Sequence, residues 1–168
     1  MKVNVYVLFA TAMAALLLIS AGTKEAKPTV GTHPGDLAPS IEFSGNGNKF
    51  EFKNQTGRYT LVNFWAAYDA ESRARNVRLW NEMSKLDSSK ITMYSISLDT
   101  NESIFTETVK ADKLTHTNQF HDGLGEKSAF FDDYNLQKGL RNFLIDAQGI
   151  IVATNVTAET LEAIAKKI

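Results

Sequence analysis

The sequence predicts an α/β protein in which a mixed central sheet is flanked by helices on both faces. Two apolar runs, "YTLVNFWAA" and "ITMYSISLD", are each followed by a segment with helical spacing. Such alternation is typical of parallel strands covered by helices on both sides. Nearer the C-terminus, "RNFLIDAQGIIVATN" contains two strands joined at residues 147–149. Because so short a connection joins antiparallel strands, we expect the sheet to be mixed.

A β-hairpin precedes the sheet. In "IEFSGNGNKFEF", two short alternating runs flank Gly45-Asn46-Gly47-Asn48, a strong hairpin signal. The run "YTLVNFWAA" that follows is continuously apolar and rich in β-branched and aromatic residues, as expected of a strand buried on both faces.

Helical spacing begins at Asp69. Apolar residues recur at helical spacing, which predicts a helix with this stripe toward the core: Ala70, Ala74, Val77, Trp80 or Met83, and Leu86. Lysine and arginine side chains occupy its other face.

Three more helical segments follow. "NESIFTETVKADK" has Asn101 as a cap, "SAFFDDYNL" is short, and "TAETLEAIAKKI" closes the chain with Thr157 as its cap. Between the first two, "HTNQF" is strand-like and "HDGLGEKS" predicts a loop.

Length and charge limit the possible functions. The chain has 168 residues and a formal net charge of −1, without a basic run. This composition suits a globular domain and gives no indication of a nucleic-acid partner.

Residues 1–22 have the pattern of a cleavable signal peptide. Lys2 precedes a mostly apolar run of about 15 residues, which ends in the small residues Ser20-Ala21-Gly22. The run is shorter than the ~20 residues that span a bilayer. We therefore expect export to the periplasm or the extracellular space, and no membrane span in the mature chain. Residues 23–39 form a linker or N-terminal extension, and residues 40–168 form the domain.

The sequence contains no cysteine. Thiol catalysis, thiolate metal ligation and iron–sulfur binding are therefore impossible in this chain, and it can form no disulfide. We expect no cofactor.

Four segments in order resemble the TlpA/ResA-type thioredoxin-like family: "GDLAPSIEFSGNGNKFEF", "GRYTLVNFWAAYDAESR", "SISLD" and "NFLIDAQGIIV". The resemblance covers nearly the whole mature chain and implies a thioredoxin-like fold. Fold alone would imply a thiol–disulfide oxidoreductase or an AhpC/TSA-like peroxidase. Fold does not carry function without the site, however.

The residues of the site depart from the family pattern. Alignment on Phe-Trp-Ala puts Tyr68 at the family's tryptophan, Asp69 at the first cysteine of Cys-x-x-Cys and Ser72 at the second. The family's cis-proline position is taken by Leu140. Because a non-proline cis bond costs about 2.5–4 kcal/mol, we predict a trans bond before Leu140.

Asp69 has a structural and a functional interpretation. The helix N-terminus that would stabilise a thiolate suits a carboxylate equally well, so Asp69 is predicted to cap the helix, with Glu71 as a second favourable charge. Alternatively, Asp69 and Glu71, with His121, could bind a divalent cation.

The favoured hypothesis is a redox-inactive domain that binds a protein or peptide at the former active-site groove. The groove would comprise Tyr68, Asp69, Glu71, Leu140 and Arg141, with Tyr68 and Leu140 forming a small apolar patch. A structural role in an envelope complex is the remaining alternative. The sequence identifies neither the partner nor the oligomeric state.

Overall fold

The computed structural model describes residues 27–43, 49–52, 57–115 and 117–167. The predicted signal peptide, the turn of the predicted hairpin and His116 lie outside these residues. Among the residues described, no helix combines the length and the apolar character that crossing a membrane requires.

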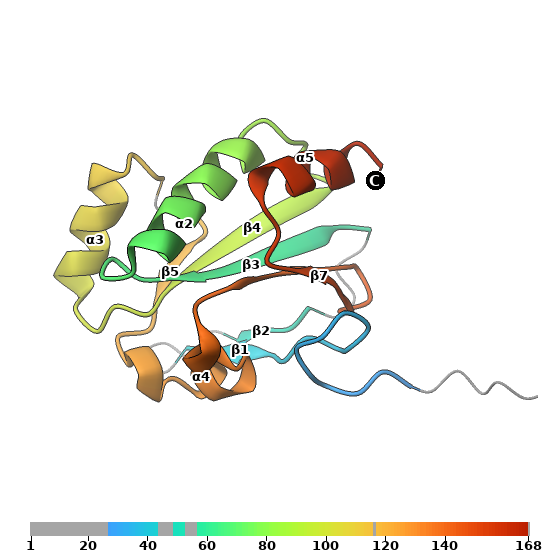
Figure 1. The fold of residues 1–168 in the computed structure, drawn as a ribbon, viewed down its shortest axis with the longest axis horizontal. Helices are drawn as coiled ribbons and strands as arrows, with labels where there is room; N and C mark the ends of the chain where they lie inside the picture. The colour runs from blue at the N-terminus through green and yellow to red at the C-terminus, as the bar shows by residue number, and fades with distance from the viewer. Residues whose placement is uncertain (1–26, 44–48, 53–56, 116, 168) are drawn as a thin grey trace, which may run out of the picture.

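A five-stranded mixed sheet forms the centre of the fold, in the order β5-β4-β3-β6-β7 (Figure 1). Strands β3 (Tyr59–Trp65), β4 (Ile91–Ser97) and β5 (Gln119–His121) are parallel. Strand β6 (Asn142–Ile145) pairs antiparallel with β3, and β7 (Ile151–Thr154) pairs antiparallel with β6. The predicted mixed sheet is confirmed.

Strand β3 is buried on both faces because its side chains alternate between two cores. Val62 and Phe64 join a cluster with Phe130, Tyr134 and Phe143. Leu61 faces the opposite way and packs with other apolar residues of that face: Leu79, Ile91, Met93, Leu144, Val156 and Leu161. Each face of the sheet therefore has its own apolar layer.

Helices cover both faces (Figure 1). On one face lie α2 (Ala70–Met83), α3 (Glu102–Ala111) and α5 (Ala158–Ala165). On the other lie α4 (Ala129–Asp133) and the 3₁₀ turns η1 (Gly125–Lys127) and η2 (Leu136–Lys138). The predicted caps Asn101 and Thr157 both accept backbone N–H groups.

The predicted hairpin lies on the α4 face. Strands β1 (Ile41–Glu42) and β2 (Lys49–Phe50) pair antiparallel, with Ile41 opposite Phe50. Residues 27–39, the described part of the predicted linker or extension 23–39, contact the β6–β7 turn. Leu37 bridges to Ile150, and the Ala38 N–H donates to the Gly149 carbonyl.

The buried face of α2 differs from the prediction. Its buried residues are Ser72, Asn76 and Leu79, whereas Ala70 and Ala74 are exposed. The apolar periodicity located the helix correctly, and Val77, Trp80 and Met83 of the predicted stripe pack against the core. The first turns of the helix do not follow the prediction, because they bury polar residues in place of Ala70 and Ala74. The reason is that polar side chains from the sheet pair with the polar side chains of α2.

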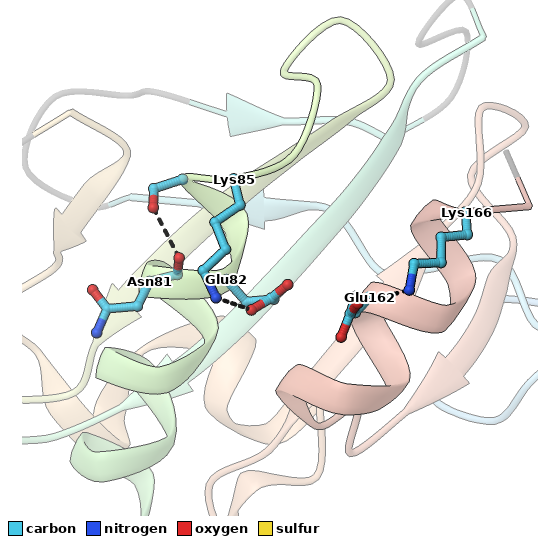
Figure 2. A network of polar contacts seen from close by, with 6 residues as sticks. Asn81, Glu82, Lys85, Glu162 and Lys166 are labelled. Carbon is cyan, nitrogen blue, oxygen red and sulfur yellow. Dashed lines mark hydrogen bonds and ion pairs between the residues drawn. The ribbon is translucent and has the colours of Figure 1, made fainter.

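Helices α2 and α5 lie side by side, and their outer surfaces carry ion pairs (Figure 2). The Lys85 Nζ lies 2.7 Å from the Glu82 Oε2, and the Lys166 Nζ lies 2.7 Å from the Glu162 Oε1. The Lys166–Glu162 pair is exposed at both side chains, and a pair of this kind contributes little to stability. The contact between the helices therefore depends on apolar residues such as Leu79 and Leu161.

Candidate functional site

The junction between β3 and α2 holds both former cysteine positions. Asp69 is the N-cap of α2, with extended backbone dihedrals, and its Oδ1 accepts the Ser72 N–H at 2.8 Å. The predicted cap is confirmed. Ser72 is 1% exposed, and its Oγ donates to the Asp69 carbonyl and accepts the Ala66 N–H. Both side chains thus hold the backbone turn into the helix.

Asp99 stabilises the same turn from the neighbouring strand. Its buried carboxylate accepts the Ala67 N–H at 3.0 and 3.1 Å and the Ser97 hydroxyl at 2.7 Å. The sequence analysis missed Asp99 as a site residue. A signal was present, because Asp99 follows β4 directly and the carboxyl ends of parallel neighbours meet at one edge.

Arg75 connects α2 to the loop that carries Leu140. Its guanidinium donates to the Leu140 carbonyl at 2.8 Å and to the Phe64 carbonyl at 3.3 Å. Burial lowers the pKa of Arg75 from its usual value, whereas the nearby carboxylates of Glu71 and Asp69 act in the opposite direction. Sequence reasoning had placed Arg75 on a solvated face.

The peptide bond before Leu140 is trans, as predicted, since no described peptide bond is cis. Gly139 precedes it with φ +116°. The Leu140 side chain is half-buried and packs against the core on the α4 face of the sheet. The Arg141 carbonyl accepts the Phe64 N–H at 3.0 Å, so the loop is bound directly to β3.

Tyr68 and Leu140 line two different hollows. The first, of about 370 Å³, contains Leu140 with Asp69, Glu71, Ser72, Arg75 and Arg141, and we call it the Asp69 hollow. The second, of about 390 Å³, lies beside Tyr68 and is lined by Leu98, Asp99, Ile104, Leu124 and Glu126, among others. We call it the Tyr68 hollow. Tyr68 and Leu140 thus contribute to different hollows, and the apolar patch expected of them stays a prediction.

The acids and histidines do not assemble a metal site. The His121 ring stacks on Phe105 at 5.2 Å, and its Nε2 lies 2.7 Å from the Asp99 carbonyl oxygen. Throughout the described ranges, no group of three His, Asp or Glu side chains could hold a metal ion. The hypothesis of a cation bound by Asp69, Glu71 and His121 is therefore wrong, because His121 is held by β4 and α3.

This geometry agrees with the comparisons to known proteins. The AhpC/TSA family matches residues 34–154. The chain belongs to this family. Within it, the chain is a divergent TlpA/ResA-type thioredoxin-like member that lacks both Cys-x-x-Cys cysteines. No curated protein matches.

Solved structures support the assignment of this AhpC/TSA member. A thioredoxin-like protein from Parabacteroides distasonis is 60% identical, with a TM-score of 0.78 over 83% of this chain and 99% of that one. The C-terminal domain of a protein described as a thiol–disulfide oxidoreductase, from Bacteroides thetaiotaomicron, is 26% identical. Its TM-score is 0.64 over 85% and 97% of the two chains. A thiol–disulfide oxidoreductase from Bacteroides fragilis is 28% identical, with a TM-score of 0.58 over 77% and 95%.

Thiol–disulfide exchange requires a thiolate that attacks a sulfur. This family member has no sulfur nucleophile, since cysteine is absent from all 168 residues. It is therefore a thioredoxin-fold protein without thiol–disulfide oxidoreductase catalysis.

Proposed function

We propose that the chain is an exported, redox-inactive thioredoxin-like domain that acts by binding a protein or peptide over the former active centre. One observation carries the proposal. Asp69 and Ser72 are both engaged in local hydrogen bonds at the helix start, whereas their neighbour Tyr68 is 67% exposed. The reactive atoms are gone, and a large aromatic side chain remains available beside them.

The chemistry of Tyr68 supports a binding role. Tyrosine offers a rigid, amphipathic contact area and is enriched in protein interfaces. On the other side of Asp69, the Asp69 hollow presents Glu71 and Arg141 to an incoming chain. A ligand that crosses the junction would meet an aromatic contact on one side and polar contacts on the other.

Redox inactivity is tested by insulin reduction with dithiothreitol as the electron donor. The wild-type protein should give the uncatalysed rate, because it cannot form a thiolate. The double variant Asp69→Cys/Ser72→Cys restores the Cys-x-x-Cys spacing and serves as the control. Turnover by the wild type above the uncatalysed rate would contradict the proposal.

Binding is tested by affinity capture from the native envelope. Tyr68→Ala should lose a partner that wild type retains, because the exposed ring supplies contact area. Val30→Ala is the matched control, since Val30 is 68% exposed and lies in the N-terminal extension. Equal retention by Tyr68→Ala and wild type would count against binding at this surface.

Export is the part of the proposal supported by residues 1–22 alone. The protein expressed from its full sequence should begin at Thr23, because cleavage after Gly22 leaves small residues at the two positions that signal peptidases read. Mass spectrometry of the intact protein measures this directly. An uncleaved N-terminus would refute the assignment.

A further inference from the structure

The Tyr68 hollow collects exposed apolar side chains. Five large hydrophobic residues are exposed in the part of the chain that the structure describes, and three of them line this hollow. They are Tyr68 at 67%, Ile104 at 50% and Leu124 at 40%. Buried Leu98 completes the apolar lining. Single exposed apolar residues are ordinary, but a cluster in a hollow indicates an interaction site.

The walls of the hollow are fixed by backbone contacts. Ile104 lies in the first turn of α3, three residues after the cap Asn101. Leu124 and Glu126 flank Gly125, where a Cβ would lie 2.8 Å from Thr100 Cγ2 and 3.0 Å from the Leu98 carbonyl oxygen. This close approach holds the segment that carries Leu124 against the end of β4. The hollow is therefore preformed, which lowers the entropic cost of binding.

The surroundings of the hollow are acidic. Asp99 and Glu126 line it, and Lys127 is the only cation among the described residues that do so. Burial raises the pKa of the Tyr68 phenol above its usual value, and the negative charges of Glu126, Asp99 and Asp69 raise it further. Three carboxylates thus act on the phenol of Tyr68.

The negative charge of the hollow favours a basic peptide segment over a second copy of the chain. The lining of each copy carries two carboxylates and one lysine, so a second copy would place net negative charge against net negative charge, which opposes association. A peptide segment with an apolar side chain next to a lysine or arginine would fit both the apolar lining and the negative charge of the hollow. The apolar group would contact Tyr68, Ile104 and Leu124, and the cation would meet Glu126 and the face of the Tyr68 ring.

We propose that the Tyr68 hollow binds a peptide segment in which a large apolar residue neighbours lysine or arginine. This inference rests on the proposed binding function and assigns it to the Tyr68 side of the former active centre. The Leu140 side then has at most an accessory role.

Selection from a phage-displayed library of short random peptides tests the proposal. The purified protein is the bait, and selected peptides are synthesised for fluorescence polarisation. We expect enrichment of apolar residues adjacent to lysine or arginine. Affinity should fall by about tenfold or more in Ile104→Lys/Leu124→Lys. It should also fall in Glu126→Lys, and it should weaken with added salt.

The variants allow the outcomes to be separated. Both apolar positions are solvent-exposed, so circular dichroism should show intact folding, and Val30→Lys is the control for adding a charge at an exposed apolar residue. Selected peptides that ignore Ile104 and Leu124 but lose affinity in Arg141→Ala would overturn this inference and leave the proposed function standing. Failure to enrich any peptide, or enrichment of acidic or purely apolar sequences, would also overturn it.

Discussion

Asp69 and Ser72 occupy the two cysteine positions of the family, and they stabilise the turn from β3 into α2 by different hydrogen bonds. Asp69 is partly exposed and satisfies one free N–H of the first helical turn. Ser72 is buried and links Ala66 to the Asp69 carbonyl through one hydroxyl. The helix N-terminus that can stabilise a thiolate here stabilises a fixed carboxylate. The substitutions therefore convert a reactive position into a structural one.

Replacing Asp69 measures the value of this cap. Asp69→Ala should lower the free energy of unfolding by about 1 kcal/mol, because the Ser72 N–H loses its acceptor. Asp69→Asn keeps an acceptor oxygen and should retain most of the stability. Urea unfolding of the three proteins provides the comparison. Equal losses in both variants would show that charge, and not the hydrogen bond, stabilises the turn.

Gly125 allows the segment that carries Leu124 to lie close to the end of β4, beside the Tyr68 hollow. Gly125→Ala combines a positive φ of +57° with the two close contacts to Thr100 and Leu98, so it should destabilise the fold and displace Leu124. Gly123→Ala is the matched control, since φ is +76° but the nearest atom is 3.6 Å away. The control should cost about 1–2 kcal/mol for the positive φ alone. Thermal unfolding should show a larger loss for Gly125→Ala, by about a further 1–3 kcal/mol for overpacking. Equal losses would remove the steric argument.

At the scale of elements, α2 is bound to the sheet by polar as well as apolar groups. Asn76 accepts hydrogen bonds from Asn63 of β3 and from Ser95 of β4, and all three side chains are buried. Arg75 extends this network to the loop before β6 through the Leu140 carbonyl. The Asn76 Nδ2 is buried without a partner among the described residues, so the hydrogen bonds to its Oδ1 are what favour one orientation of α2.

Loss of Arg75 should detach this loop. Arg75→Met keeps much of the aliphatic length but removes the donors to Leu140 and Phe64. Hydrogen bonds to charged groups contribute about 1.5–3 kcal/mol, and we expect a loss of stability in that range. Arg78→Met, on the exposed face of the same helix, should change stability little. Chemical denaturation checks both, and similar losses in the two variants would contradict a specific role for Arg75.

In the whole molecule, the central sheet lies between two layers, and the former active centre lies at the end of β3 where α2 begins (Figure 1). Helices α2, α3 and α5 form one layer, and α4 with the β1–β2 hairpin forms the other (Figure 1). Tyr134 connects the second layer to the N-terminal extension, because its buried hydroxyl donates to the Pro39 carbonyl at 2.6 Å. The former active centre lies where β3, β4 and the loop before β6 meet.

The Tyr134 contact predicts a pH dependence. Burial, the larger cause, and the charge of Asp133 raise the pKa of Tyr134 far above its usual value. The folded state therefore keeps the proton that the unfolded chain releases near pH 10. Stability from this group is present below that pH and is lost as the pH rises further, by about 1.4 kcal/mol per pH unit.

Tyr134→Phe isolates that contribution. At neutral pH the variant should be less stable by about 1 kcal/mol, because the Pro39 carbonyl loses its donor. Above pH 10 the difference should shrink, since phenylalanine has no proton to release. Denaturant unfolding from pH 8 to 11 measures both curves. Parallel curves across that interval would refute the assignment.

The fold class, the order of the elements and the loss of thiol chemistry could all be predicted from the amino-acid sequence. Strands and helices space their apolar residues differently. Continuous apolar runs therefore located β3 and β4, helical spacing located α2, and two runs joined by a short turn located the final hairpin. The absence of cysteine excludes thiol exchange whatever the fold. Asp69 was recognised as a cap because capping is a local interaction between residues three apart.

Which side chains share a surface could not be predicted, because that depends on how distant segments pack. Asp99 supports the Asp69 turn from the loop after β4, and Leu124 lines the same hollow as Tyr68 from a loop more than 50 residues away. The separation of Leu140 from Tyr68 and the polar buried face of α2 also depend on packing between distant segments. Local periodicity carries no information about such contacts, because it records the surroundings of a residue within one element and not the elements that pack against it.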